Sequence, residues 1–208
     1  MTADPLPESL SLLDWRRTIG EVYVEIRAAP DKEAAWRRWQ SIRSRLFRTH
    51  PQSPLPVQER GGYTGPHLFD YDPAWCLTAA VEAAEPTRLE IATSTVDTMA
   101  FTRFGVARFR HAGTALSLEL YWLEGYGGGL FVPFADATSG KETYGAGRYL
   151  LDTVKGADLG VRDGRLVLDF NFAYQPSCAY DPRWTCPLAP PANRLAVAVR
   201  AGERASAG

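Results

Sequence analysis

The period of the hydrophobic pattern changes once along the chain, from about 3.6 residues to two. Over residues 9–28, and again after Pro30-Asp31, apolar side chains recur at every third or fourth position, as they do in amphipathic helices. From residue 75 onward they alternate with polar side chains, as in half-buried strands. The change predicts two N-terminal helices followed by strands that have no helices between them.

Each predicted helix has one apolar face. The first face consists of Leu12, Trp15, Ile19, Val22 and Ile26, and the second of Trp36, Trp39, Ile42, Leu46 and Phe47. Ser11 with Asp14 is expected to cap the first helix, Asp31 the second, and His50-Pro51 ends the second. Arg37, Arg38, Arg45 and Arg48 lie opposite the second face, where a solvated surface with local ion pairs is favoured over a polyanion site.

The strand pattern predicts a fold of the α+β class that is mainly antiparallel β. About eight strands are expected in a sandwich or barrel, with hairpin turns at His111-Ala-Gly-Thr114 and Asp163-Gly164. Strands are expected over residues 166–174 and 195–200 among others. The predicted organisation is a helical pair over residues 1–50 on the same core, a long Pro- and Gly-rich connection over 51–74, and a β-rich domain over 75–208.

Composition excludes several classes of partner. The 23 basic and 24 acidic side chains give a net charge of −1, so no overall field attracts nucleic acid or an anionic membrane. Three cysteines are too few for a disulfide-dense secreted scaffold. The N-terminus has no signal-peptide pattern, and the longest uncharged apolar stretch, residues 125–135, is too short to span a bilayer. We expect a soluble cytoplasmic protein.

Two polar stretches carry the candidate chemistry, and the first covers residues 134–149. Asp136 precedes Thr-Ser-Gly and favours a turn, whereas Tyr144 and Arg148 are four residues apart. The guanidinium of Arg148 fits a carboxylate, which belongs either to a ligand or to Asp136 or Asp169. A structural ion pair is the simpler of the two interpretations.

The second stretch covers residues 168–180. Alternation places Asp169 and Asn171 on one face of a strand, roughly 7 Å apart, and an aromatic row that ends at Tyr174 on the other. In a cavity, such a pair can orient a substrate or supply a general base. The simpler alternative is that both side chains hydrogen-bond turns and pair with an arginine such as Arg148.

Cys178 and Cys186 form a candidate thiol site with several interpretations. They are structural thiols, a disulfide, half of a zinc site, or a nucleophile at Cys178 that receives a base such as His50 or His67 through the fold. The chain has no standard catalytic, nucleotide or metal motif, so no cofactor and no metal are predicted.

The same stretches carry a family resemblance. The residues concerned are Phe134-Ala-Asp-Ala-Thr-Ser-Gly-Lys-Glu-Thr-Tyr-Gly-Ala-Gly-Arg-Tyr-Leu150, Leu168-Asp-Phe-Asn-Phe-Ala-Tyr174, Cys178-Ala-Tyr180, Cys186-Pro-Leu188 and Asn193-Arg-Leu195. The sequence resembles a bacterial family called domain of unknown function 1684, in a short form without the extra N-terminal segment of longer members. The resemblance implies one compact domain whose polar motifs belong together, and it implies no activity.

Three functions fit these observations. The first is a small-molecule pocket on a β scaffold, roofed by residues 51–73, which in its extended form is a cofactor-independent hydrolase, lyase or isomerase. The second is a non-catalytic binding or interaction module, with which an oligomer is compatible. The third is a zinc-dependent hydrolase that uses the two cysteines and His50. For the first, the catalytic residues are Asp136, Tyr144 and Asp169, and the ligand-binding residues are Arg148, Asn171 and Tyr174.

Overall fold

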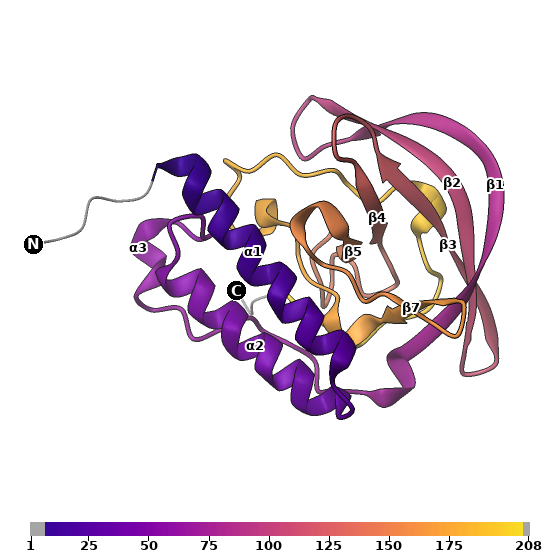
Figure 1. Ribbon diagram of the computed structural model, residues 1–208, viewed down its shortest axis with the longest axis horizontal. Helices are drawn as coiled ribbons and strands as arrows, with labels where there is room; N and C mark the ends of the chain where they lie inside the picture. The colour runs from indigo at the N-terminus through magenta and orange to yellow at the C-terminus, as the bar shows by residue number, and fades with distance from the viewer. Residues whose placement is uncertain (1–6, 206–208) are drawn as a thin grey trace, which may run out of the picture.

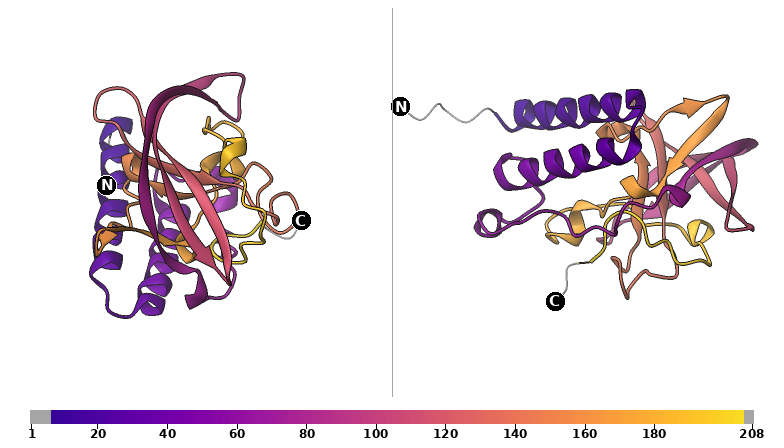
Figure 2. Two further views of the ribbon diagram at one scale, coloured as in Figure 1. Left: turned by 90° about the vertical axis from the view of Figure 1, so that its right-hand side faces the viewer. Right: turned by 90° about the horizontal axis from the view of Figure 1, so that it is seen from below.

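Two long helices occupy one side of the molecule and a curved antiparallel sheet the other (Figure 1). The computed structural model describes residues 7–205. The helices α1 (Glu8–Ala28) and α2 (Lys32–Thr49) run side by side. The right-hand view of Figure 2 shows the strands beyond the end of the helical pair at which α1 leads into α2. Among residues 7–205, no helix combines the length and apolar character needed to cross a membrane.

The helix boundaries follow local capping chemistry. Asp31 caps α2 as predicted, because its Oδ1 accepts a hydrogen bond of 2.9 Å from the backbone N–H of Ala34, and His50 ends the helix. The predicted capping pair Ser11 and Asp14 is wrong. Helix α1 begins at Glu8, so Ser11 lies within its first turn and donates to the carbonyl of Glu8.

Within the described residues the sheet has seven strands in the order β5-β4-β3-β2-β1-β7-β6, and all neighbours are antiparallel. The strands are β1 (Cys76–Ala92), β2 (Thr98–His111), β3 (Thr114–Leu123), β4 (Gly129–Phe134), β5 (Arg148–Asp152), β6 (Val161–Arg162) and β7 (Arg165–Asp169). The α+β class with mainly antiparallel β structure is confirmed. The sheet is single and open, which corrects the expectation of an eight-stranded sandwich or barrel.

Two predicted strands differ for identifiable reasons. Strand β7 stops at Asp169, because its carboxylate accepts from the backbone N–H of Asn171 and begins a 3-10 helix, η3 (Phe170–Phe172). Residues 195–200 form no strand, since the carbonyl of Val199 accepts from the side chain of Arg148. Both hairpin turns are confirmed, with positive φ at Ala112-Gly113 and at Asp163-Gly164.

One buried cluster joins the helices to the sheet. The apolar face predicted for α2 is buried, and Trp39 meets Phe172 edge to face at a ring separation of 5.5 Å. Tyr23 of α1 packs on the same Phe172 ring, and Leu118 of β3 belongs to the same cluster. The helices therefore cover the segment that follows β7.

The connection between helices and sheet is held at several points along its length. It contains a short helix, α3 (Val57–Arg60), and then runs extended to a 3-10 turn, η1 (Pro73–Trp75). Leu68 forms an isolated β-bridge with Glu203 near the C-terminus. This bridge places Glu203 in the interior, where it is fully buried.

Candidate functional site

Seven of the eight predicted site residues lie at three separate points, and Tyr174 lies at none of them. The first is a buried ion pair in which Nη2 of Arg148 lies 2.8 Å from Oδ2 of Asp136. Nη2 also donates to the carbonyl of Val199, and Nη1 donates to those of Ala201 and Glu203. Both charged side chains are 1% exposed or less, so this guanidinium braces the C-terminal segment from inside.

The second point is a clamp on the long connection. The Asn171 side chain accepts from the backbone N–H of Asp72 at 2.9 Å and donates to the Asp72 carbonyl at the same distance. Its amide also donates to Oδ1 of Asp169 at 2.8 Å. Asp169 and Asn171 therefore fasten the connection to the sheet at Asp72, as the hydrogen bonds of the simpler interpretation predict. The arginine pairing in that interpretation is wrong, because Arg148 pairs with Asp136 instead.

The third point joins Tyr144 to the two cysteines. The hydroxyl of Tyr144 lies 3.7 Å from Sγ of Cys178, and the backbone N–H of Cys178 donates to Sγ of Cys186 at 3.3 Å. His50 does not join them, because its Nε2 faces Asp14 and its Nδ1 accepts from Gln52. Within residues 7–205, no three His, Cys, Asp or Glu side chains are grouped as ligands of a metal ion. The catalytic roles of Asp136, Tyr144 and Asp169 stay predictions.

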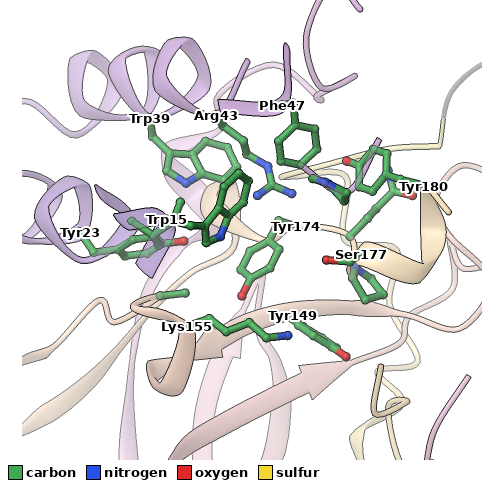
Figure 3. A pocket seen from close by; sticks show the side chains of 15 residues that line it. Trp15, Tyr23, Trp39, Arg43, Phe47, Tyr149, Lys155, Tyr174, Ser177 and Tyr180 are labelled. Atoms are coloured by element: carbon green, nitrogen blue, oxygen red, sulfur yellow. The ribbon is translucent and has the colours of Figure 1, made fainter. Parts of the chain in front are cut away.

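A different set of residues surrounds a cleft between the helices and the segment 149–180. This helix–sheet cleft has a volume of about 50 Å³. Figure 3 shows the side chains of α1 and α2 on one side of it and those around Tyr174 and Lys155 on the other. The lining residues are Trp15, Ile19, Tyr23, Trp39, Arg43, Phe47, Pro54, Tyr149, Lys155, Ala157, Tyr174, Gln175, Pro176, Ser177 and Tyr180.

Arg43 is a buried charged group of the cleft, and its contacts hold it in a fixed position. Its Nε and Nη2 donate to the two carboxylate oxygens of Glu203 at 2.6 and 3.2 Å, and both side chains are buried. Glu203 also accepts from the backbone N–H of Gln175 and from the hydroxyl of Tyr180. Four donors thus satisfy this carboxylate, and they hold Arg43 so that its guanidinium lies over the rings of Phe47 and Tyr174.

Two phenol groups of the cleft are free to donate. The hydroxyl of Tyr23 is buried and has no hydrogen-bond partner among the described residues, and in Figure 3 it points toward the cleft. Burial raises the pKa of Tyr23 well above its ordinary value. Burial, assisted by the charge of Asp152, does the same to the pKa of Tyr174. Both phenols therefore keep their protons at neutral pH and act as hydrogen-bond donors.

Lys155 supplies a second cation at the mouth of the cleft. It belongs to a 3-10 turn, η2 (Thr153–Lys155), that directly follows β5. Its Nζ lies 3.5 Å from Oδ2 of Asp152, and its side chain is 46% exposed. Figure 3 shows its amino group below the Tyr174 hydroxyl and beside Tyr149.

Of the residues predicted for a ligand site, Tyr174 lines this cleft, whereas Arg148 and Asn171 lie elsewhere. Sequence reasoning missed Tyr23, Arg43 and Lys155. A signal for Arg43 was present, because it follows Trp39 by four positions and so lies on the apolar face of α2. An arginine on a buried face needs a partner, and that requirement marks it as a candidate.

Comparison with known proteins places the chain in a family. A family model described as "Protein of unknown function (DUF1684)" matches residues 61–204. The chain belongs to the DUF1684 family. The solution NMR structure of an uncharacterized protein from Haloarcula marismortui is similar, with 35% identity and a TM-score of 0.61 over 83% of this chain and 93% of that one. The search of curated proteins found no match.

The extent of the family match bears on the cleft of this DUF1684 protein. The matched residues begin at 61, so α1 and α2 precede them. Trp15, Tyr23, Trp39, Arg43 and Phe47 come from these helices, whereas Tyr149, Lys155 and Tyr174 come from the matched part. The cleft therefore lies at the junction between the matched DUF1684 region and the helical pair.

Proposed function

We propose that this DUF1684 protein binds a small organic carboxylate in the helix–sheet cleft. The observation that carries the proposal is the Tyr23 hydroxyl, a buried donor that points to the cleft and has no partner among the described residues. A buried donor without a partner costs about 1–3 kcal/mol. A bound oxygen atom would remove this cost, and Tyr23 would then contribute to binding.

The other polar groups of the cleft favour an anion. Arg43 and Lys155 line it, whereas their carboxylate partners Glu203 and Asp152 are not among the lining residues. Positive charge and neutral phenol donors therefore line the space, and no carboxylate is among its described lining residues. A carboxylate accepts hydrogen bonds at two oxygens and matches this arrangement.

The walls and the volume limit the ligand to a compact molecule. Trp15, Trp39 and Phe47 supply aromatic surface for an apolar body. The volume of about 50 Å³ is well below the roughly 300–1,000 Å³ of pockets that hold drug-sized ligands. A carboxylate with few further non-hydrogen atoms fits the cleft in this conformation, and a larger ring would require the exposed side chain of Lys155 to move.

The lining supports binding more strongly than acid–base catalysis. Among the described residues that line the cleft there is no Asp, Glu or His, which are the usual general bases. Lys155 is the one amine, and it is paired with Asp152. We therefore place a binding function ahead of a cofactor-independent hydrolase, lyase or isomerase.

A second basic groove is a weaker candidate. It lies on the sheet around Arg108, Arg110 and Arg165. Each of these arginines is exposed and already donates to protein, to Glu82, the carbonyl of Gly113 and Thr78 respectively. The groove has no buried unpartnered donor among the described residues, so nothing in it requires an anion.

Calorimetric titration tests the proposal with matched pairs of ligands. Acetate, propionate and benzoate are compared with acetamide, propionamide and benzamide, which have nearly the same shape and no charge. We expect the favoured carboxylate to bind with a Kd of about 0.05–1 mM, given about 1–1.5 kcal/mol for each atom of a very small ligand. Its amide should bind at least tenfold more weakly. Equal binding of acid and amide, or no binding of any carboxylate, contradicts the proposal.

Two tyrosine variants locate the binding site. Tyr23→Phe removes the unpartnered hydroxyl of the cleft, and Tyr63→Phe removes a second buried, unpartnered hydroxyl that is not among the lining residues. Loss of a hydrogen bond to a charged group costs about 1.5–3 kcal/mol. Tyr23→Phe should therefore weaken carboxylate binding by about 10- to 100-fold, whereas Tyr63→Phe should leave it within about twofold. Similar affinities in both variants place the ligand outside the helix–sheet cleft.

A further inference from the structure

We propose that Cys178 and Cys186 form a hydroperoxide-reactive dithiol that closes to a reversible disulfide. The two cysteines are adjacent in the fold, because the backbone N–H of Cys178 donates to Sγ of Cys186 at 3.3 Å. Neither is engaged in a disulfide in this structure. Their contact, their unequal exposure and the groups around them assign a different role to each.

Cys178 has the properties of the attacking thiol. It lies in a 3-10 turn, η4 (Ser177–Ala179), and is half-buried, so small oxidants reach it. The hydroxyl of Tyr144 lies 3.7 Å from its Sγ. The adjacent Cys186 thiol and the Tyr144 hydroxyl lower the pKa of Cys178 to about 6, although burial opposes them. Cys178 is therefore mostly thiolate at neutral pH, and the thiolate is the reactive form.

Cys186 has the properties of the resolving thiol. It is 1% exposed, and the adjacent Cys178 and burial both raise the pKa of its thiol far above the ordinary value. Its backbone is fixed to the end of β1, since the Cys186 carbonyl accepts from the Ser94 N–H at 2.8 Å and its N–H donates to the Ser94 hydroxyl. An external oxidant is excluded from Cys186, but a sulfenic acid on Cys178 forms beside it.

The two steps balance with a hydroperoxide as the oxidant. The Cys178 thiolate attacks the distal peroxide oxygen, a sulfur–oxygen bond forms, the oxygen–oxygen bond breaks, and the leaving alkoxide or hydroxide takes a proton to give an alcohol or water. The Cys186 thiol then attacks Sγ of the Cys178 sulfenic acid. A disulfide forms and water leaves with the thiol proton. The two thiols lose two electrons in total, and the peroxide gains them.

Cys76 is a control within the same chain. It is also half-buried, but burial and the neighbouring Asp169 raise the pKa of its thiol to about 11. At pH 7 the fraction of thiol present as thiolate is about four orders of magnitude larger for Cys178 than for Cys76. A thiolate of lower pKa is a weaker nucleophile, and this reduces the advantage in rate by about two orders of magnitude. We expect Cys178 to react with hydrogen peroxide or iodoacetamide tens of times faster than Cys76.

Peptide mass spectrometry after treatment with one equivalent of hydrogen peroxide tests the inference. We expect a Cys178–Cys186 cross-linked peptide that dithiothreitol reverses, while Cys76 stays available for alkylation. In Cys186→Ser, dimedone should trap a sulfenic acid on Cys178 and no cross-link should form. In Cys178→Ser, Cys186 should stay reduced. Oxidation of Cys76 at a rate equal to that of Cys178, or rapid oxidation of Cys186 in Cys178→Ser, overturns the inference.

The pH dependence of alkylation examines the environment of Cys178 without removing either cysteine. The iodoacetamide rate at Cys178 should rise with a midpoint near pH 6 in the wild-type protein. Tyr144→Phe removes one donor to the sulfur and should move the midpoint to higher pH. A wild-type midpoint at the ordinary value for a cysteine, with no change in Tyr144→Phe, also overturns the inference.

Discussion

At the scale of single side chains, Arg148 shows how a group suited to ligands can serve the fold instead. Four of its N–H groups bond to Asp136 and to the carbonyls of Val199, Ala201 and Glu203, while its Nε–H has no described partner. These carbonyls belong to a segment without regular secondary structure. The guanidinium thus donates the hydrogen bonds that a neighbouring strand would donate to the carbonyls of that segment.

Replacing Arg148 should therefore damage the fold. Arg148→Met leaves the buried carboxylate of Asp136 unpaired, which costs about 3–5 kcal/mol. For a chain of this length the melting temperature should fall by about 6–20 °C. Arg108→Met is the matched control, because the ion pair of Arg108 with Glu82 is exposed and such pairs contribute about 0–1 kcal/mol. Equal melting temperatures of the two variants would show that the interior pair is not structural.

Asp169 should make stability depend on pH. Burial raises the pKa of Asp169 above the ordinary 3.8, although hydrogen bonds from Asn171 oppose this effect. The folded state thus holds the proton more tightly than the unfolded chain. The resulting stabilisation is present in full below the unfolded pKa and is lost as the pH rises through the folded pKa.

Asp169→Asn isolates this contribution, since it keeps an oxygen acceptor for Asn171 and carries no charge. We expect the stability of the variant relative to the wild type to increase between pH 3 and pH 7. Urea unfolding at these two pH values measures the difference. A relative stability that stays constant or decreases with pH would contradict the assignment.

Sequence reasoning identified several of these residues and misjudged their geometry. It anticipated the ion pair of Arg148 with Asp136 as the simpler alternative. It did not separate that pair from Asn171, because the distance between them depends on where β7 ends. Nothing in the sequence around Glu203 marks it as a buried residue. Its partner Arg43 is 160 positions away, and no local pattern reports such a contact.

At the scale of elements, the β2–β3 hairpin gives a direct test of turn chemistry. Its two turn residues, Ala112 and Gly113, have φ angles of 46° and 82°. Alanine is strained in this left-handed region, whereas asparagine tolerates it. Ala112→Asn should therefore stabilise the protein by a few tenths to about 1 kcal/mol.

Thermal unfolding measures that change, and Gly113→Ala provides its opposite. Alanine at position 113 would have to adopt a φ of 82°, although no neighbouring atom obstructs a Cβ there. The variant should lose stability through backbone strain alone. If both variants melt at the temperature of the wild type, the turn geometry is not as described.

Elements were predictable where short-range chemistry decides them. Helix α2 has a capping Asp31 and a largely apolar buried face, and each hairpin has a glycine in its two-residue turn. Strand β1 was harder, because it continues past Pro86 through a shift of register between Ala83 and Thr87. The sequence pattern divides it in two. Strand order and the openness of the sheet depend on pairings between distant segments, and alternation does not encode them.

At the scale of the whole molecule, the helical pair and the C-terminal segment meet at Glu203. This residue bonds to Arg43 of α2 and to Tyr180 beyond η4, while its backbone pairs with Leu68. Helix α2, the segment around Tyr180 and the connection at Leu68 therefore meet at Glu203, next to the helix–sheet cleft. A ligand held there would contact both the helices and the sheet region.

The measurement that tests the central claim most directly is an NMR titration of the ¹⁵N-labelled protein with acetate. We predict saturable shifts at the indole N–H groups of Trp15 and Trp39 and at the backbone amides of Ser177 and Tyr180, all of which belong to cleft residues. Shifts that map to the groove around Arg108 and Arg165, or no saturable shift at the cleft, would contradict the claim that the helix–sheet cleft binds a carboxylate.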